Sequence, residues 1–212
     1  MTIDNLTLVT MTCQVILLVT KARLCSVSEL PSWYPGTETK PAPMPLLRVQ
    51  GFINTRDVED GTDLLSDPAS ARSWLTDAGL LNDTAELTER DLERARAVRE
   101  AIRSLIEDDR DDRLEPLRDL AAAHHARLSV ADDGKVELEN ARGDGLGDGL
   151  FELLLIIHRA QQDGRWPRLK VCGNPDCQWV FFDRSRNQQG SWCNMAACGN
   201  RLKNRELRAR RR

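Results

Sequence analysis

Apolar residues recur at helical spacing through much of the chain after residue 46. The clearest series follows Thr88, where Asp91 three residues later forms an acidic variant of the capping box. Its apolar positions repeat every three or four residues: Leu92, Ala95, Val98, Ile102, Leu105 and Ile106. An earlier helix is predicted to begin at Asp67 and Pro68, with the aspartate as N-cap, and to stop at Gly79.

The following segments predict two more helices and a hairpin between them. Residues 116–126 predict a helix, and residues 150–163 predict another that is apolar nearly all round and therefore central and buried. Residues 128–130 and 136–138 alternate in polarity around an Asp-Gly turn, which predicts a β-hairpin. Residues 143–149 are rich in glycine and aspartate but lack the Lys-Ser/Thr of a phosphate loop, so we predict a flexible connection.

The first 45 residues differ from the rest of the chain. Residues 6–19 are moderately apolar, but their longest unbroken apolar run is residues 15–19, too short for a transmembrane helix. Residues 31–45 hold five of the nine prolines, which is typical of a linker. We predict that residues 1–45 are a disordered extension, or an over-long start, followed by this linker. A weak membrane or export segment is the alternative, and Cys13 and Cys25 would be unpaired.

Four cysteines near the C-terminus stand in two pairs of identical internal spacing. Four residues lie within each pair and fifteen separate the pairs: Cys172, Cys177, Cys193 and Cys198. This spacing predicts one closed, structural zinc site. Two disulfides in an oxidising compartment are the alternative, but nothing in the sequence argues for secretion. The turn formers at 173–175 can bring the first pair together, and the β-prone residues 180–182 predict one arm of a hairpin.

The pattern becomes helical again after Asn194, with a strong positive charge. From Gly199 onward there are seven basic residues and one acid. We expect one face of this helix to be turned to the metal: Met195, Cys198, Leu202 and Ala209. A helix this positive suits a phosphate backbone, and a solvated, frayed terminus is the alternative. The predicted nucleic-acid contacts are Asn200, Arg201, Lys203, Arg205 and Arg208.

Charge is divided unevenly along the chain. Residues 165–212 carry twelve Lys/Arg against three Asp/Glu, whereas residues 1–164 carry eighteen against thirty. Two regions of opposite sign indicate two tasks, with the acidic part away from nucleic acid or shielding the basic tail. Signatures of catalysis are missing: the sequence has no Gly-x-Ser-x-Gly and no His-Glu-x-x-His, and His158 is expected to be a core residue. We therefore predict that the protein is not an enzyme; a ligand-processing helical domain is the minor alternative.

Several motifs together resemble the CGNR zinc finger. They are Cys-x4-Cys, the segment Phe-Phe-Asp-x-Ser-x-Asn at 181–187, Trp-Cys-x-Met at 192–195, and Cys-Gly-Asn-Arg at 198–201. In that family the finger follows a helical domain, called ABATE, in bacterial proteins regarded as stress-induced transcriptional regulators. Residues 46–55 resemble the opening of that domain, where Asn54 and Thr55 are expected to cap the next element, or else to line a pocket. The chain departs from the pattern at 188–191, where many members carry basic residues.

The sequence thus predicts a mainly α protein in two parts. Residues 46–165 form a multihelical, ABATE-like domain with a small β-hairpin, and residues 166–212 form a four-cysteine finger with a knuckle, a short hairpin and a basic helix. We expect one structural Zn²⁺, a cytoplasmic location, and a regulator that binds double-stranded DNA. Its helical domain would take a small-molecule effector or protein partner, and a homodimer is open. A zinc-stabilised RNA-binding or protein-binding module is the alternative.

Overall fold

The computed structural model describes residues 30–35, 40–108, 112–141, 143 and 145–210. It divides the chain into two compact units, residues 1–32 and residues 33–212. The predicted disordered or over-long extension and the two unpaired N-terminal cysteines fall on residues 1–29, outside the described part.

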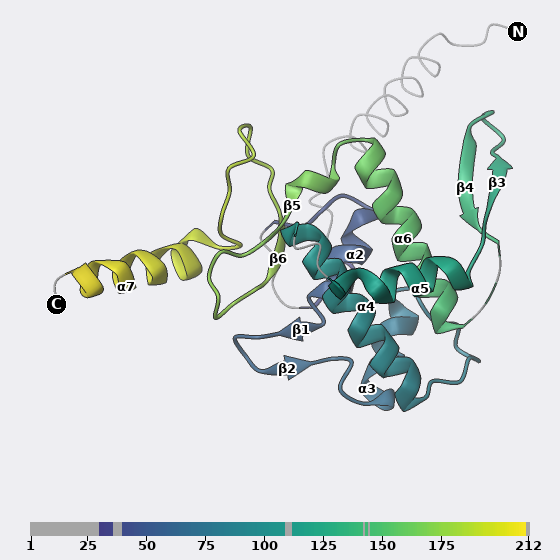
Figure 1. Ribbon diagram of the computed structural model, residues 1–212, viewed down its shortest axis with the longest axis horizontal. Coiled ribbons are helices and arrows are strands. Elements are labelled where there is room, and N and C mark those ends of the chain that lie inside the picture. The colour runs from purple at the N-terminus through teal and green to yellow at the C-terminus, as the bar shows by residue number, and fades with distance from the viewer. Residues whose placement is uncertain (1–29, 36–39, 109–111, 142, 144, 211–212) are drawn as a thin grey trace, which may run out of the picture. The chain divides into compact units, whose positions relative to one another are not determined.

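Helices make up about half of the described residues of the second unit (Figure 1). The α-helices are α2 (Leu46–Ile53), α3 (Pro68–Asp77), α4 (Glu89–Glu107), α5 (Glu115–Ala123), α6 (Leu146–Gln162) and α7 (Asn200–Arg210). Short 3₁₀ turns lie at Asp112–Leu114 and Trp166–Arg168, and a π-helical turn lies at Met195–Gly199. In the described residues, no helix is both long enough and apolar enough to cross a bilayer.

The predicted helix boundaries at α3 and α4 are confirmed by their capping contacts. The Asp67 carboxylate accepts hydrogen bonds from the backbone N–H groups of Ala69 and Ser70, at 3.1 and 3.0 Å. After α3, Gly79 adopts a left-handed φ of +67°, which an L side chain would strain. At α4 the Thr88 hydroxyl accepts from Asp91 N–H at 3.2 Å, while the Asp91 carboxylate accepts from Thr88 N–H at 2.9 Å.

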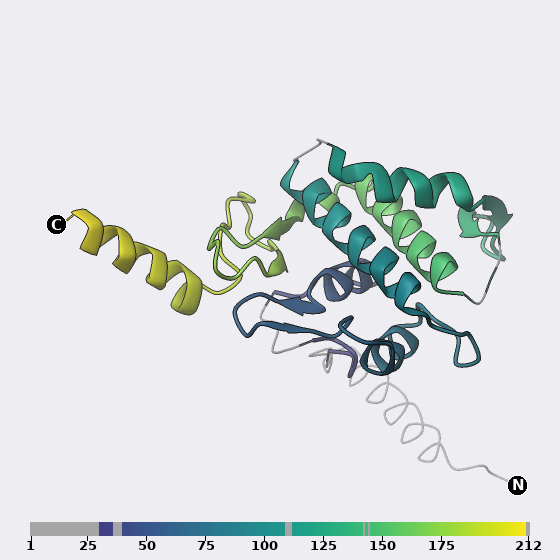
Figure 2. The ribbon, with the colours of Figure 1, turned by 60° about the horizontal axis from the view of Figure 1, so that its bottom comes forward.

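The hydrophobic core lies where α4 and α6 pack against α2, α3 and α5 (Figure 2). The apolar positions predicted for α4 point inward, and most of the apolar residues of α6 are buried as expected. The largest fully buried apolar side chains of the core include Phe52, Leu92, Ile102, Leu120 and Leu150. Each such burial contributes about 1.5–3 kcal/mol relative to exposure, so the core can hold the helices together without a metal.

Three two-stranded antiparallel hairpins complete the described fold. The predicted hairpin is present as β3 (Ala126–Val130) and β4 (Val136–Asn140), with Leu128 opposite Leu138. The predicted finger hairpin pairs β5 (Leu169–Val171) with β6 (Val180–Phe182). A third one, β1 (Arg56–Asp57) with β2 (Thr62–Asp63), was not predicted, because two-residue strands carry no periodic signal.

Two expectations about the helix α6 region are wrong. The segment 143–149 is not a flexible loop throughout, because α6 begins at Leu146. Gly149 lies so close to the loop between α3 and α4 that a Cβ there would stand 1.9 Å from the Leu80 carbonyl oxygen. The absence of a side chain at Gly149 therefore permits α6 to contact the backbone at Leu80 closely. His158, expected in the core, is exposed on the outer side of α6.

The proline-rich stretch is not a free linker where the structure describes it. Tyr34 and Ala42 are buried, and the Trp33 ring meets the Trp74 ring edge-on at 6.2 Å between centroids. The Lys40 carbonyl accepts a hydrogen bond from Phe182 N–H at 2.9 Å. These contacts hold residues 33–35 and 40–45 against the helical core, although a domain boundary near residue 45 stays a prediction.

Candidate metal centre and basic helix

The four predicted ligand cysteines converge at one point. Their sulfur atoms all lie within 4.8 Å of one another, and all four residues are buried: Cys172, Cys177, Cys193 and Cys198. The sulfur atoms of Cys177 and Cys193 stand 3.7 Å apart, as do those of Cys193 and Cys198. A tetrahedral zinc ion with bonds of about 2.3 Å requires sulfurs about 3.8 Å apart, whereas a disulfide requires about 2.05 Å. The spacing therefore fits one zinc ion and not two disulfides.

The knuckle between β5 and β6 positions the first pair of cysteines. Cys172 follows β5 directly, and its N–H donates to the Trp179 carbonyl at 2.9 Å. The buried Asn174 carbonyl accepts from Cys177 N–H at 3.0 Å, which closes the turn. Gln178 then takes a left-handed φ of +56° so that the chain can enter β6. The turn-forming residues thus do what the sequence predicted.

A helix cap positions the second pair. The Asn194 side-chain oxygen accepts from Ala196 N–H at 2.9 Å and from Ala197 N–H at 3.2 Å. The Asn194 backbone carbonyl accepts from Cys198 N–H at 3.0 Å within the π-helical turn. The predicted single helix from residue 194 is therefore a π turn followed by α7, and the wider turn carries Cys198 back toward Cys193.

The thiols perturb one another because they are packed so closely. Hydrogen bonds from Cys177 and then Cys193 lower the pKa of the Cys172 thiol to about 2. The same hydrogen bond with Cys172 raises the pKa of Cys177 to about 12. Sulfurs in this arrangement cannot all become thiolates without a cation, and a divalent zinc ion supplies the missing charge.

A buried carboxylate fixes the loop that leads to the second cysteine pair. Asp183, 3% exposed, accepts from Ser185 N–H at 2.9 Å, Gly190 N–H at 2.7 Å and Lys170 Nζ at 2.9 Å. Burial raises the pKa of Asp183, but the hydrogen bonds from Ser185 and Lys170 outweigh it and leave the pKa well below its ordinary value. From the sequence, Asp183 was recognised only as part of the motif at 181–187. The aspartate two residues before a serine could have indicated the turn that its side chain closes.

Two side-chain amides of the helical domain, those of Asn54 and Gln50, contact the finger at Val180. The Asn54 amide nitrogen donates to the Val180 carbonyl at 2.8 Å, and the Asn54 oxygen accepts from Val180 N–H at 2.8 Å. Gln50 adds a hydrogen bond to the same carbonyl at 3.1 Å. The expectation that Asn54 and Thr55 cap the next element is wrong for their side chains. Thr55 is also buried, and its hydroxyl accepts a hydrogen bond from Arg99 at 3.0 Å.

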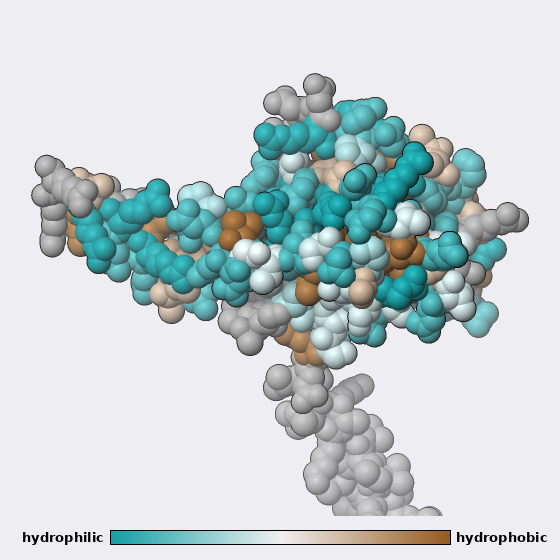
Figure 3. All heavy atoms as spheres, turned by 90° about the horizontal axis from the view of Figure 1, so that it is seen from below, coloured by the Kyte–Doolittle hydropathy of each residue, from teal (hydrophilic) through white to brown (hydrophobic). Residues whose placement is uncertain are grey.

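The predicted nucleic-acid contacts all lie on α7 and are all exposed: Asn200, Arg201, Lys203, Arg205 and Arg208. Hydrophilic residues cover most of this helix in the space-filling view (Figure 3). Arg201 pairs with Glu59 at 2.6 Å, and Arg205 pairs with Asp176 at 3.4 Å. A shallow hollow of about 510 Å³ is lined by Arg201, Asn204, Arg205, Arg208 and Ala209.

The expected apolar face of this helix is only partly present. Cys198 is buried and Leu202 is half-buried, but Met195 is 46% exposed and Ala209 is exposed. The wider π turn breaks the helical register between Met195 and α7. Ala209 lies one turn beyond Arg205, which contacts Asp176 of the knuckle. Apart from its first turn, α7 is therefore a solvent-exposed, positively charged helix.

A multihelical domain joined to a four-thiol centre and an exposed basic helix defines a two-part zinc-finger protein. A family model described as "Putative stress-induced transcription regulator", the ABATE domain, matches residues 49–160. A second, the CGNR zinc finger, matches residues 168–211. The chain belongs to the ABATE family and carries a CGNR zinc finger, in the order that the sequence predicted. No curated protein matches the chain.

These matches confirm a regulatory, zinc-binding class and one structural zinc. Both matched families are of regulator or zinc-finger type, and neither is described as an enzyme. The absence of catalysis, the contact with DNA and the ligand-by-ligand assignment stay predictions.

Proposed function

We propose that this protein is a cytoplasmic regulator of transcription in which one zinc ion holds a basic helix in position for double-stranded DNA. The proposed metal ligands are Cys172, Cys177, Cys193 and Cys198. Their support is the sulfur spacing of 3.7 Å, which matches a tetrahedral thiolate site. With four protein ligands such a site is closed, so its role is to fold the finger rather than to activate water.

The observation that carries the proposal is the position of α7 relative to the thiol cluster. Helix α7 starts two residues after Cys198, so the metal would fix its first turn. Exposed Arg201, Lys203, Arg205 and Arg208 would contact phosphates, and Asn200 would cap locally or reach a base edge. Two of these arginines already bind carboxylates in the free protein, which supports their capacity to hold oxyanions.

The helical domain, residues 46–165, is proposed to act as a sensor or partner-binding module. A cavity of about 620 Å³ lies between α4 and the knuckle. Arg103 and Ser104 line its helical side, while Cys172 and Gly173 line the other. This size suits a small molecule, and a ligand there would touch both parts of the protein. A homodimer is also proposed, because a single finger seldom gives sufficient specificity alone.

The test is selection from a random pool of duplex DNA with the zinc-loaded full chain, beside a sample treated with a chelator. Enrichment of one sequence, abolished by the chelator, is expected. Binding through several phosphates should also weaken with salt. The logarithm of the binding constant should fall by about 0.9 per log unit of salt concentration for each phosphate neutralised. Tight binding without enrichment would contradict a sequence-specific regulator.

A zinc-stabilised module for RNA or an acidic protein partner is the second candidate. The specific observation in its favour is that Arg201 and Arg205 are already paired with Glu59 and Asp176, so α7 accepts carboxylates. If no duplex binds at low salt while the zinc content is complete, this second candidate replaces the first.

A further inference from the structure

The first arginine of α7 is occupied in the free protein. Arg201 Nη1 lies 2.6 Å from Glu59 Oε1, although the two residues are 142 positions apart in the sequence. Glu59 lies in the turn between β1 and β2, which we call the acidic turn (residues 57–60). Both partners are partly exposed, at 55% for the Arg201 side chain and 39% for Glu59. The contact therefore joins the helical domain to the proposed DNA-binding helix at a site open to solvent.

The acidic turn has a defined backbone. One carboxylate oxygen of Asp57 accepts hydrogen bonds from Glu59 N–H at 2.9 Å and from Asp60 N–H at 3.0 Å. This is the local closure by which an aspartate side chain stabilises a turn. Glu59 is consequently presented from a fixed position rather than from an unstructured loop.

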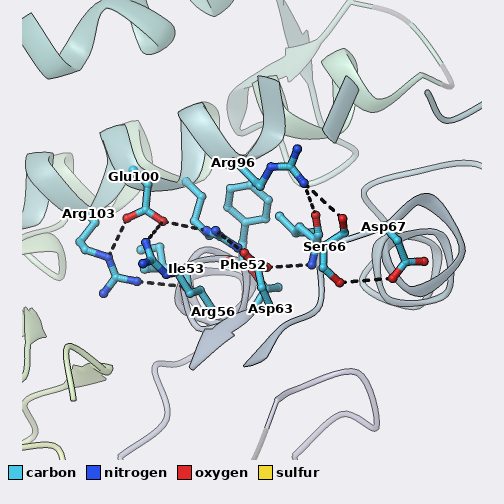
Figure 4. Close-up of polar contacts among 12 residues, drawn as sticks. Phe52, Ile53, Arg56, Asp63, Ser66, Asp67, Arg96, Glu100 and Arg103 are labelled. Carbon is cyan, nitrogen blue, oxygen red and sulfur yellow. Dashed lines mark hydrogen bonds and ion pairs between the residues drawn. The ribbon is translucent and has the colours of Figure 1, made fainter. Parts of the chain in front are cut away.

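Helix α4 anchors the hairpin that carries this turn. Two oxygens of Asp63 accept from Arg99 at 2.7 and 2.8 Å, and the Arg99 side chain is only 2% exposed. On the other strand, Arg56 pairs with Glu100 at 3.5 Å. Figure 4 shows Arg56 beside Glu100, with Asp63 farther along the same face of the helix. A buried bidentate pair of this kind is among the strongest side-chain contacts, so the acidic turn is firmly held.

A carboxylate and a phosphate compete for the same guanidinium. Arginine binds both through its planar fork of N–H donors, and a bound carboxylate also repels an approaching phosphate. On the basis of the proposed function above, we propose that Arg201 is a phosphate subsite of α7, and that Glu59 fills this subsite until duplex DNA displaces it. The acidic turn is thus an internal competitor of the DNA backbone.

The size of the effect follows from the exposure of the pair. An exposed ion pair of this kind changes a dissociation constant by only about 1.5- to 5-fold. Glu59 would therefore tune the affinity of the helix and favour those duplexes whose other contacts are good enough to displace it. It would not act as an all-or-none lock.

Two variants of equal charge test the proposal. Glu59→Gln removes the carboxylate that contacts Arg201. Asp60→Asn is the matched control, because it removes the same charge from the next residue, which forms no ion pair among the described residues. Binding of the zinc-loaded full chain to a duplex of about 30 base pairs and random sequence is measured by fluorescence anisotropy at low salt. We expect Glu59→Gln to bind about 1.5- to 5-fold more tightly than Asp60→Asn.

An Arg201→Gln background separates competition from a general charge effect. In that background, affinity should fall, and Glu59→Gln and Asp60→Asn should become indistinguishable. Equal affinities of the two variants with Arg201 present would overturn the competitor role and leave DNA binding intact. If the wild-type chain and every variant fail to bind the duplex while retaining zinc, the proposed function itself is wrong and this inference fails with it.

Discussion

The helical domain and the finger build their interiors in different ways. In the helical domain, leucine, isoleucine and phenylalanine side chains from five helices form one continuous apolar core. In the finger, the buried cluster consists of four cysteines around Phe181, with Trp179 and Trp192 at its edge. A segment of about forty residues cannot bury enough apolar surface to fold alone, whereas a bound zinc ion can supply on the order of 10 kcal/mol.

The two interiors share strand β6 as a common wall. Val180 and Phe182 belong to the helical core, whereas Phe181 between them belongs to the cysteine cluster. This alternation is what a β-strand imposes on successive side chains. A metal-dependent part and a metal-independent part can therefore meet within three residues. The unfolding caused by loss of zinc should extend no further than β6.

Removing one cysteine should have the largest effect. Cys193→Ser is expected to abolish stoichiometric zinc and to unfold the finger, at a cost on the order of 10 kcal/mol to that part, while helices α3 to α6 stay folded. Zinc is measured by elemental analysis and the folded region by limited proteolysis. Ser191→Ala is the control and should keep its zinc. An unchanged metal content in Cys193→Ser would contradict the four-ligand assignment.

Truncating a side chain in the helical core should also have a large effect, but on the stability of the helical domain and not on zinc binding. Leu150→Ala, at a fully buried position on α6, is expected to lower the free energy of unfolding by about 2–5 kcal/mol. Zinc stoichiometry should stay at one, because the thiols do not depend on this side chain. Urea denaturation measures the change, with Leu207→Ala on exposed α7 as control. Loss of zinc in Leu150→Ala would show that the two interiors are not separable.

Breaking the hydrogen bonds between Asn54 and Val180 should have an intermediate effect. Asn54→Ala leaves the buried Val180 N–H without its side-chain partner, which costs about 1–3 kcal/mol, whereas the Val180 carbonyl keeps its hydrogen bond from Gln50. Hydrogen exchange at the Val180 amide should accelerate by the corresponding factor. Asn204→Ala, on an exposed position of α7, is the control. Unchanged protection at Val180 would mean that the amide pair does not hold β6.

Changing the exposed apolar residues of the β3–β4 hairpin should have the smallest effect. Leu128 is 72% exposed, so Leu128→Ala removes almost no buried surface. We expect the free energy of unfolding to change by less than about 0.5 kcal/mol. Thermal unfolding measures it beside Leu150→Ala. A loss as large as that of a core leucine would indicate that a partner covers this hairpin.

Patterns with a local physical cause were predictable from the sequence. The caps at Asp67 and Thr88, the periodic face of α4 and the cysteine spacing each depend on neighbouring residues, and each is present as predicted. Residues whose partners are distant in sequence were not predictable. Asn54 looked like a cap because its partner, Val180, lies 126 residues away.

The errors have similar causes. The proline-rich stretch was interpreted as a linker because its composition is typical of linkers. Composition does not reveal that Tyr34 and Ala42 are buried against the core. The glycine segment was interpreted as a loop because composition cannot reveal that Gly149 must pass against Leu80. The β1–β2 hairpin, which carries Glu59, is too short to leave any periodic trace.

The amide pair of Asn54 has a consequence for how such proteins can be recombined. The edge of β6 is completed by the side chain of Asn54, the residue directly after α2, so part of the pairing partner of the finger lies outside its own segment. Transplanting residues 166–212 behind an unrelated domain would leave that edge open. A shuffled protein would keep its metal ligands and yet expose Val180 and Phe182, so we expect this finger to be inherited together with its helical domain rather than exchanged as an independent cassette.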